Sequence, residues 1–329
     1  GQLRLVYPDY HRALFTSDKN SEKVQKTEAI LEDAAKAQEA EQAATGKVRA
    51  QSYWQVSWNI FKKNKLGMIC LGIVLLLAII AILAPILAPY SYKDQNLAIQ
   101  NQNPTFAHLL GTDEYGRDIL SRIIYGCQIS LSVGIISQAI ALFIGFVAGV
   151  AAGYYGRWVD AVVSFIIQVF SSFPFLLFAI LIMFVMGPGL INLYIALGLL
   201  MWTTTARLIR GDVMRLKNSE YIQSCILSGG NSFRIIMKHL LPNCISTLIV
   251  VSTLGIPSAI LSEATLSFLG LGVQPPEASW GQMIAASQPY LASQPLYSIA
   301  PGIVIIITVM SFNLLGDALR DALDPKMRS

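Results

Sequence analysis

The sequence predicts an all-α integral membrane fold with six transmembrane helices. Hydrophobic residues make up 54% of the 329 positions and charged residues only 13%, against about 25% charged in a soluble domain. Runs of about 20 apolar residues, the length that crosses a hydrocarbon core, occur six times. Lys and Arg are concentrated in alternate loops between these runs, and this asymmetry is what sets orientation in a membrane.

The region before the first apolar run divides into two parts. Residues 1–51 are charged and rich in Ala, Gln and Glu, with a polar helix predicted inside them. We interpret them as a solvated cytoplasmic tail, with a docking helix for a partner as the alternative. In residues 52–65, Trp54, Trp58 and Phe61 fall at helical spacing and lysines follow. This pattern predicts an amphipathic helix lying in the membrane interface.

The predicted spans differ in regularity. The first has no charge from Met68 to Pro89 and follows a polar region of 65 residues, so it is not expected to be a cleavable signal peptide. The third carries Pro174 near its middle, which predicts a kink or tilt. The fourth is short and follows a Gly-Pro-Gly run. The six predicted spans are residues 66–87, 129–152, 159–186, 190–206, 245–264 and 299–315.

The charge distribution predicts that both termini face the cytoplasm. The segment between the fourth and fifth spans carries six cations, whereas two of the three predicted outer loops carry none. The net charge of +4 is therefore a topology signal, and we do not interpret it as nucleic-acid binding. These six cations are Arg207, Arg210, Arg215, Lys217, Arg234 and Lys238.

That same segment contains a polar hairpin, residues 218–242, predicted to hold two short helices. Asn218 and Ser219 are expected to cap the first, and Gly229 with the next glycine to end it near residue 228. The second is predicted over 233–240, where Pro242 would stop it.

The second short helix has a basic face. Arg234 and Lys238 lie four residues apart and so share one side. A loop at a membrane surface has no other need for two capped helices. The pattern is typical of a surface that docks against another protein.

The first outer segment, HLLGTDEYGRDILSRIIYG, is polar at first and then amphipathic. Thr112 or Asp113 is predicted to cap a helix that reaches Tyr125. We interpret the segment as a structural scaffold on the outer surface, with direct solute contact by its charged residues as the alternative. The scaffold residues are Gly111, Thr112, Asp113, Gly116, Arg117 and Asp118.

Polar residues inside the spans are candidates for a solute pathway or gate, because burying them in lipid is costly. Glu263 stands out, since a central acid costs about 2.5–3.5 kcal/mol on insertion scales. A structural or gating role and direct solute binding both remain open for it. For the other polar residues, hydrogen bonds between helices are an equal alternative. They are Gln138, Gln168, Ser171, Ser172, Asn192 and Asn313.

Glycines repeat at every fourth position of the second span, at Gly145, Gly149 and Gly153. Such spacing predicts close helix packing. The packing partner could be another subunit.

Motifs for chemistry are absent from the sequence. No G-x-x-x-x-G-K-[ST] occurs, so ATP phosphates are not expected to bind here. The chain also has no H-E-x-x-H, C-x-x-C or G-x-S-x-G, and its three histidines are far apart. The four cysteines are interpreted as packing residues without disulfides. We therefore expect no enzyme activity, no metal and no cofactor on this chain.

Three motifs, in this order, resemble the permease subunits of ATP-binding-cassette (ABC) importers, specifically the oligopeptide and dipeptide branch. HLLGTDEYGRDILSRIIYG matches that branch's first outer loop, EYIQSCILSGGNSFRIIMKHLLPN its cytoplasmic coupling loop, and SFLGLGVQPPEASWG its last outer loop. The closing GDALRDALDPKMR also fits. The resemblance covers residues from about 54 to 329 and leaves the N-terminal tail outside. It implies a type I importer permease domain over residues 66–329.

The coupling loop departs from the family pattern at one position. The family usually has Glu-Ala-Ala where this chain has Gln223, Ser224 and Cys225, while the later glycine, leucine and proline are kept. An acidic residue at the position of Glu220 is also usual in this branch. The resemblance implies that the loop docks in a cleft on a cytoplasmic ATPase. Its residues are Glu220, Tyr221, Gln223, Ser224, Cys225, Gly229, Arg234, Lys238, His239, Leu241 and Pro242.

The resemblance also implies a function. We expect a permease subunit of the bacterial inner membrane that moves peptides by alternating access, with ATP and Mg bound by its partners. Those partners would be a second homologous permease, two ATPase subunits and an extracytoplasmic solute-binding protein, besides membrane lipid and no nucleic acid. Nickel chelates, glutathione-like compounds and oligosaccharides are alternative solutes.

Two other classes remain open. An ATP-independent secondary transporter would need coupling acids within the spans, and apart from Glu263 there are almost none. An intramembrane enzyme would need clustered nucleophiles or metal ligands at membrane depth. Both leave the polar hairpin unexplained.

Overall fold

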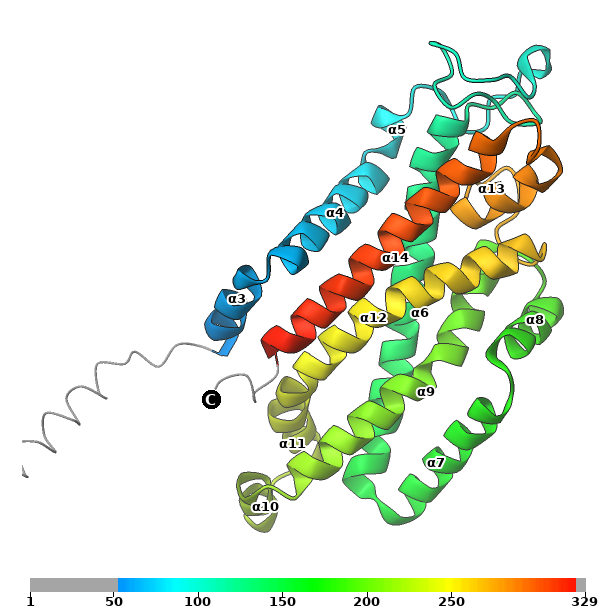
Figure 1. Cartoon of the computed structure of the whole chain (residues 1–329). Coiled ribbons are helices and arrows are strands. Elements are labelled where there is room, and N and C mark those ends of the chain that lie inside the picture. The colour runs from blue at the N-terminus through cyan, green and yellow to red at the C-terminus, as the bar shows by residue number, and fades with distance from the viewer. Residues whose placement is uncertain (1–52, 324–329) are drawn as a thin grey trace, which may run out of the picture. The chain divides into compact units, whose positions relative to one another are not determined.

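The computed structural model describes residues 53–323, which form helices joined by turns and loops (Figure 1). Within that part of the chain, the only β-pairing is an isolated bridge between Thr112 and Asp118. The chain divides into two compact units, Gly1–Val56 and Ser57–Ser329, and the arrangement below is that of the second. The predicted polar tail and the last residues of the closing motif lie outside the described residues.

Five long helices make up most of the second unit: α4 (Lys65–Ile82), α6 (Ile119–Tyr155), α9 (Leu190–Lys217), α12 (Leu241–Phe268) and α14 (Pro295–Leu323). Helix α6 packs against α9 and α12, and α14 packs against α12 and α4. Shorter elements are α3 (Tyr53–Lys63), α5 (Ala84–Leu87), α7 (Arg157–Ser172), α8 (Phe175–Met186), α10 (Glu220–Leu227), α11 (Ser232–Ile235) and α13 (Trp280–Ser287).

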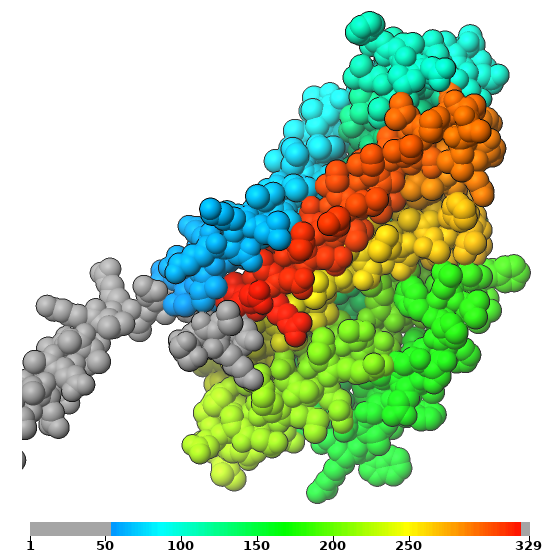
Figure 2. Space-filling model, viewed as in Figure 1, coloured from blue at the N-terminus to red at the C-terminus, as the bar shows by residue number. Residues whose placement is uncertain are grey.

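The long helices run between two ends with different contents (Figure 1). At one end lie α10 and α11, and we call this the hairpin end. At the other lie residues 88–118 and α13, and we call this the scaffold end. Figure 2 shows the scaffold loops, in cyan, packed close to α13 and the start of α14, in orange.

Helix α3 agrees with the helix predicted before the first span. The ring of Trp58 remains exposed, and the Lys62 Nζ atom lies 5.2 Å from its centroid. Phe61, by contrast, is buried against Cys70 and Ala318. The placement of this helix in a membrane interface stays a prediction.

The three glycines of α6 lie against α9. A Cβ atom on Gly145 would lie 2.5 Å from the Cβ of Thr205, and one on Gly153 would lie 2.8 Å from the Cβ of Val213. The predicted close packing is confirmed. The packing partner is α9 of the same chain and not another subunit.

Between residues 53 and 323, four helices are long and apolar enough to cross a membrane: α4, α6, α14 and the continuous helix Ser232–Phe268. A fifth candidate is the pair α7 and α8, whose axes differ by 92°. Pro174 cannot donate a backbone hydrogen bond and disfavours helical geometry at Phe173, which is extended. The kink predicted at Pro174 is therefore a complete break.

The predicted fourth span lies in α9, which has 28 residues and is about 42 Å long. It is not among the four apolar candidates. Asn192, a run of three threonines and Arg207 make it more polar than the others. A count of six spans therefore depends on α9 and on the broken pair.

The first outer segment differs from its prediction. Helix α6 begins at Ile119 and runs through Tyr125 to Tyr155 without a break. Its cap is Asp118, whose Oδ2 accepts a hydrogen bond from the Ser121 N–H at 2.8 Å. Thr112 and Asp113 were wrongly predicted as caps because they lie in the preceding turn.

Candidate functional site

The hairpin begins as the sequence predicted. Helix α10 ends at Leu227, and Gly229 follows with a φ of 77°, a conformation that glycine adopts without a steric penalty. The Gly230 N–H then donates to the carbonyl of Cys225 at 3.0 Å. Ser219 stands at the N-cap position, but its hydroxyl donates to the Leu216 carbonyl and does not cap the helix.

The second half of the hairpin corrects one prediction. Asn231 caps α11, its Oδ1 accepting from the Phe233 N–H at 3.0 Å. The chain continues through a π-helical turn (Ile236–Leu240) directly into α12. Pro242 does not stop the helix, because it directly follows this π-helical turn, in which the Leu241 N–H donates to the Ile236 carbonyl, and a local π adjustment of this kind accommodates a proline inside a helix. Residues Ser232–Phe268 therefore form one continuous helix.

One side of the hairpin is anchored to the membrane helices. Ile222, Ile235 and Leu240 are fully or almost fully buried and pack with Ile209 and Val213 of α9. Apolar burial of this kind holds the two short helices at fixed positions.

The opposite side of the hairpin is exposed and carries apolar and basic groups together. Leu227 is 85% exposed and Phe233 71% exposed. A large aromatic that the fold leaves uncovered beside cations is typical of a contact surface. The predicted docking residues include the two cations but neither Leu227 nor Phe233. We call this surface the hairpin patch: Leu227, Phe233, Arg234, Met237 and Lys238.

Gln223, the departure from the family motif, has a structural partner. Its Nε2 donates to the carbonyl of Lys217 at 2.9 Å, joining α10 to the last turn of α9. A carboxylate at this position could not donate, and it would face the negative end of the α9 dipole. Glu220 is exposed in the first turn of α10, where a negative charge is favourable.

The remaining predicted hairpin residues have local roles. The Ser224 hydroxyl donates to the Glu220 carbonyl, and the rings of Tyr221 and His239 lie 6.4 Å apart. Cys225 is partly buried beside the anchored side, and Leu241 is the first residue of α12.

At the scaffold end, the predicted charged residues form a buried ionic cluster. Arg117 Nε lies 2.6 Å from Asp113 Oδ2, and Arg122 Nε lies 3.5 Å from the same oxygen. The three side chains are at most 2% exposed. Charges this deep are tolerated only when they are paired.

The cluster ties the loop to two other helices. Arg122 Nη2 donates to Gln282 Oε1 of α13 at 2.9 Å, and the Tyr297 hydroxyl of α14 donates to Glu114 Oε2 at 2.8 Å. Gly111 and Gly116 provide the left-handed turns around it. With Asp118 only 4% exposed as well, this geometry favours the scaffold role over direct solute contact.

Glu263 lies at the scaffold end of α12 and is fully buried. Its Oε1 accepts hydrogen bonds from Ser267 Oγ at 2.6 Å and from Ser279 Oγ at 2.7 Å. Ser279 is itself the N-cap of α13. The carboxyl group therefore fastens α13 to α12. This contact favours a structural role for Glu263 over direct solute binding.

The other predicted pathway residues do not gather around Glu263. Gln168, Ser171 and Ser172 are exposed on α7, and Asn313 is exposed on α14. Ser171 accepts from Arg207, and the Ser172 hydroxyl donates to the Gln168 carbonyl.

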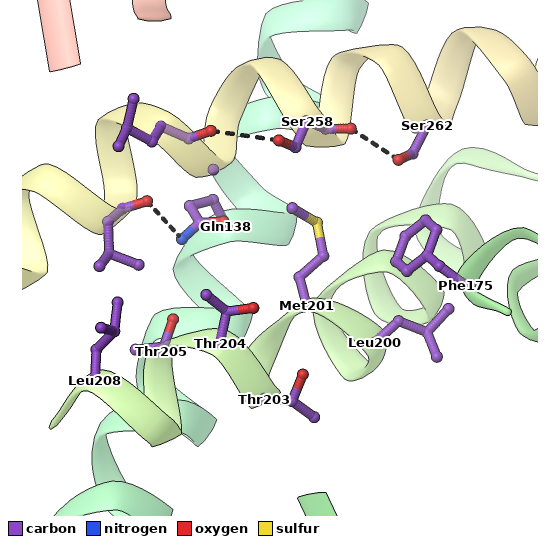
Figure 3. Close-up of a pocket in the computed structure, with 13 residues that line it drawn as sticks. Gln138, Phe175, Leu200, Met201, Thr203, Thr204, Thr205, Leu208, Ser258 and Ser262 are labelled. Atoms are coloured by element: carbon purple, nitrogen blue, oxygen red, sulfur yellow. Dashed lines mark hydrogen bonds between the residues drawn. The ribbon is translucent and has the colours of Figure 1, made fainter. Parts of the chain in front are cut away.

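The structure reveals a pocket that those predictions largely missed (Figure 3). It has a volume of about 430 Å³, lies between α6, α8, α9 and α12, and is partly open on one side. Of the sequence-derived candidates only Gln138 lines it. Serines and threonines are common in membrane helices, so the others gave no distinct signal. The lining residues are Gln138, Phe175, Leu200, Met201, Thr203, Thr204, Thr205, Leu208, Val251, Leu254, Gly255, Ser258 and Ser262.

Comparison with known proteins places this geometry in a family. Residues 145–329 match the binding-protein-dependent transport system inner membrane component family, and residues 52–104 match the N-terminal transmembrane domain of oligopeptide transport permease C. The dipeptide transport system permease protein DppC of Alkalihalophilus pseudofirmus is 42% identical over 280 residues, covering 85% of this chain and 92% of that protein.

Two further relatives carry different names. The glutathione transport system permease protein GsiD of Pectobacterium atrosepticum is 40% identical, covering 84% of this chain and 92% of that protein. The oligopeptide transport system permease protein OppC of Bacillus subtilis is 39% identical, with coverage of 85% and 92%.

The fold is also similar to a solved structure. A chain of the inward-facing MetNI methionine ABC transporter superposes with a TM-score of 0.52 at 19% identity, covering 63% of this chain and 98% of that one. With the apolar helices described above, these matches indicate a multi-pass inner-membrane protein. The chain belongs to the family of binding-protein-dependent transport system inner membrane components, the membrane permease subunits of ABC transporters.

Proposed function

We propose that this chain is the permease subunit of an ATP-driven importer that moves dipeptides or oligopeptides across the cytoplasmic membrane. The single observation that carries the mechanism is the continuous helix Ser232–Phe268. It joins the exposed hairpin patch at one end to the wall of the membrane pocket further along. The names of the relatives from A. pseudofirmus and B. subtilis support peptide as the solute.

In this proposal the chain crosses the membrane six times. The broken pair α7 and α8 forms the third span and α9 the fourth, within a permease domain over residues 66–329. The cations of the hairpin support a cytoplasmic position for it and for both termini by the positive-inside rule. The scaffold end then faces the outside, and residues 52–65 lie in the inner interface.

Coupling would pass through the hairpin patch. A cytoplasmic ATPase that binds ATP and Mg would contact Phe233 and Leu227, with Arg234 and Lys238 at the rim. Because α10 and α11 are anchored on α9 and α12, displacement of the patch would move those helices as well. ATP can drive the change only through different affinities for the inward-facing and outward-facing states.

The assembly would contain a second homologous permease, two ATPase subunits and an outer solute-binding protein. Glu220 is the acid we expect at the ATPase contact, since Gln223 is engaged with α9. For Glu263 we propose the fastening role described above and not solute binding.

Glutathione is the second candidate solute, because the relative from P. atrosepticum is named for it. It is itself a small peptide-like molecule with amide bonds, so the same membrane pathway would suit both. Nickel chelates and oligosaccharides have no such support here, and an ATP-independent transporter leaves the hairpin patch without a partner.

The test is purification of the tagged chain in mild detergent with its partners, followed by reconstitution into liposomes. We expect a second permease and two ATPase copies to co-purify, and ATP-dependent uptake of labelled dialanine in the presence of the solute-binding protein. Glutathione uptake without dialanine uptake would replace the peptide assignment. A chain that purifies alone and moves solute without ATP would contradict the importer function.

A further inference from the structure

The pocket lies at mid-depth in the bundle. Thr204 is about 21 Å along α9 from the scaffold end, and Ser258 is about 26 Å along α12 from the hairpin end. In Figure 3 the threonines of α9 lie across from Ser258 and Ser262 of α12, with Gln138 of α6 beside them. A transporter must pass its solute through this depth.

The lining of the pocket is polar yet carries no charge. Its polar side chains are five hydroxyls and one amide, and none of the lining residues is ionisable. Ser262 Oγ donates to the Ser258 carbonyl at 2.7 Å. Its oxygen lone pairs remain free to accept from an N–H group.

One buried hydroxyl of the lining has no partner in the described part of the chain. Thr205 is 1% exposed, and its Oγ1 forms no hydrogen bond there. An unpaired polar atom buried at membrane depth costs free energy. A neutral hydrogen-bonding group of a ligand would relieve that cost once a shift of the pocket wall uncovers this hydroxyl.

These observations point to one kind of occupant. We infer that the pocket contacts the main-chain amide groups of the transported peptide and leaves charged termini and side chains in the aqueous part of the pathway. Neutral hydroxyls can pair with amides but cannot compensate a buried charge. Each such bond is weak, which suits a site that solute must leave as readily as it enters.

The inference depends on the proposed import function and adds a consequence for selectivity. Amides are common to all peptides, so the pocket would accept peptides of different side-chain charge. A lipid chain would gain nothing from six polar groups. A side chain of the second permease is the remaining competitor for the space.

The wall of the pocket is also connected to the hairpin. Gly255 lines the pocket, and a Cβ atom there would overlap the amide of Gln138. Two residues later, Pro257 interrupts the backbone hydrogen bonds of α12. Because α12 continues from the hairpin, movement of the patch would reshape this wall first.

The experiment uses the reconstituted complex and three labelled dipeptides: dialanine, alanyl-glutamate and alanyl-lysine. Wild-type uptake is measured first, and failure to import any of them would refute the proposed function itself. Given wild-type uptake of all three at similar rates, we compare Thr204→Asp with Thr204→Lys. Thr265→Asp and Thr265→Lys serve as matched variants of an exposed threonine outside the pocket.

We expect Thr204→Asp to lower alanyl-glutamate uptake about tenfold relative to alanyl-lysine uptake. Thr204→Lys should lower alanyl-lysine uptake instead. In each variant, a fixed charge in the pocket would repel a solute of the same charge. Equal effects on all three dipeptides would overturn the inference, as would charge selectivity in the Thr265 variants alone.

A second measurement covers the case in which the charged variants do not assemble. Ser258→Cys is made in a Cys225→Ser background and treated with a hydrophilic maleimide. Labelling that dialanine suppresses supports a solute-contact pocket. A thiol that stays unlabelled in both the presence and absence of ATP would mean that a lipid or the second permease fills the space.

Discussion

The two ends of the permease use charge in opposite ways. At the scaffold end, Asp113, Arg117 and Arg122 are buried and paired with one another. At the hairpin end, Arg234 and Lys238 are exposed beside the uncovered rings and chains of Phe233 and Leu227. In the sequence both regions are simply polar interruptions between apolar runs. Charged residues therefore stabilise the fold of the loop at the scaffold end, whereas at the hairpin end they remain accessible for binding a partner.

The strongest test of this contrast is to remove the shared acid of the scaffold cluster. We expect Asp113→Ala to destabilise the protein by about 3–5 kcal/mol, because two buried guanidinium groups lose their partner. Thermal unfolding of the purified complex in detergent measures this. Asp94→Ala, an exposed acid in the same loop, is the control, and an equal shift in both variants would show that the cluster is not structural.

At the hairpin end the expected effect is on coupling and not on stability. Phe233→Ala should weaken ATPase binding by about 2 kcal/mol, the loss typical of an aromatic anchor at an interface. The unfolding temperature should stay close to that of the wild type, because the ring is largely exposed. Co-purification of the ATPase and solute-stimulated ATP hydrolysis are the measurements. A fall in stability with coupling intact would break the comparison.

Between the two ends, Gly255→Ala tests whether α12 transmits movement of the hairpin patch to the pocket. The added methyl group would overlap the Gln138 side chain, at a cost of about 1–3 kcal/mol for overpacking. We expect uptake to fall while ATP hydrolysis continues. Gln138→Ala in the same chain should restore uptake in a double-mutant cycle, and purely additive losses would argue against a shared contact.

The smallest expected effect is that of introducing, at Gln223, the acid that the family usually has there. Gln223→Glu would lose the hydrogen bond to the Lys217 carbonyl and place a negative charge near the end of α9, costing about 1 kcal/mol. Hydrogen exchange over α10 should become faster. Improved coupling without any change in exchange would show that the acid serves the ATPase contact and that Gln223 weakens it.

Local signals in the sequence were enough for the hairpin turn. Asn231 caps a helix with its own side chain and Gly229 adopts the left-handed conformation, so neither depends on distant residues. Pro242 was misjudged, because a proline usually stops a helix in its interior, whereas here a π-helical turn directly before it accommodates the ring. The residue pattern does not predict such a turn.

The burial of the first outer loop and the formation of the pocket both depend on contacts between residues far apart in the sequence. The charged residues of the first outer loop are buried because Gln282 and Tyr297, more than 150 residues further along, complete their hydrogen bonds. The pocket exists because α6, α9 and α12 bring Gln138, the threonines and the serines to one depth. No spacing within a single helix reveals that convergence.

The π-helical turn between the hairpin and α12 has a consequence for how such a protein can change over time. A turn of this kind holds one residue more than an α-helical turn, and each residue of an α-helix corresponds to a rotation of about 100°. Loss or gain of one residue at Ile236–Leu240 would therefore re-aim Leu227, Phe233 and Arg234 around the axis of α12 and leave the pocket intact. The turn is a point at which the permease could be matched to a different ATPase without altering its solute pathway.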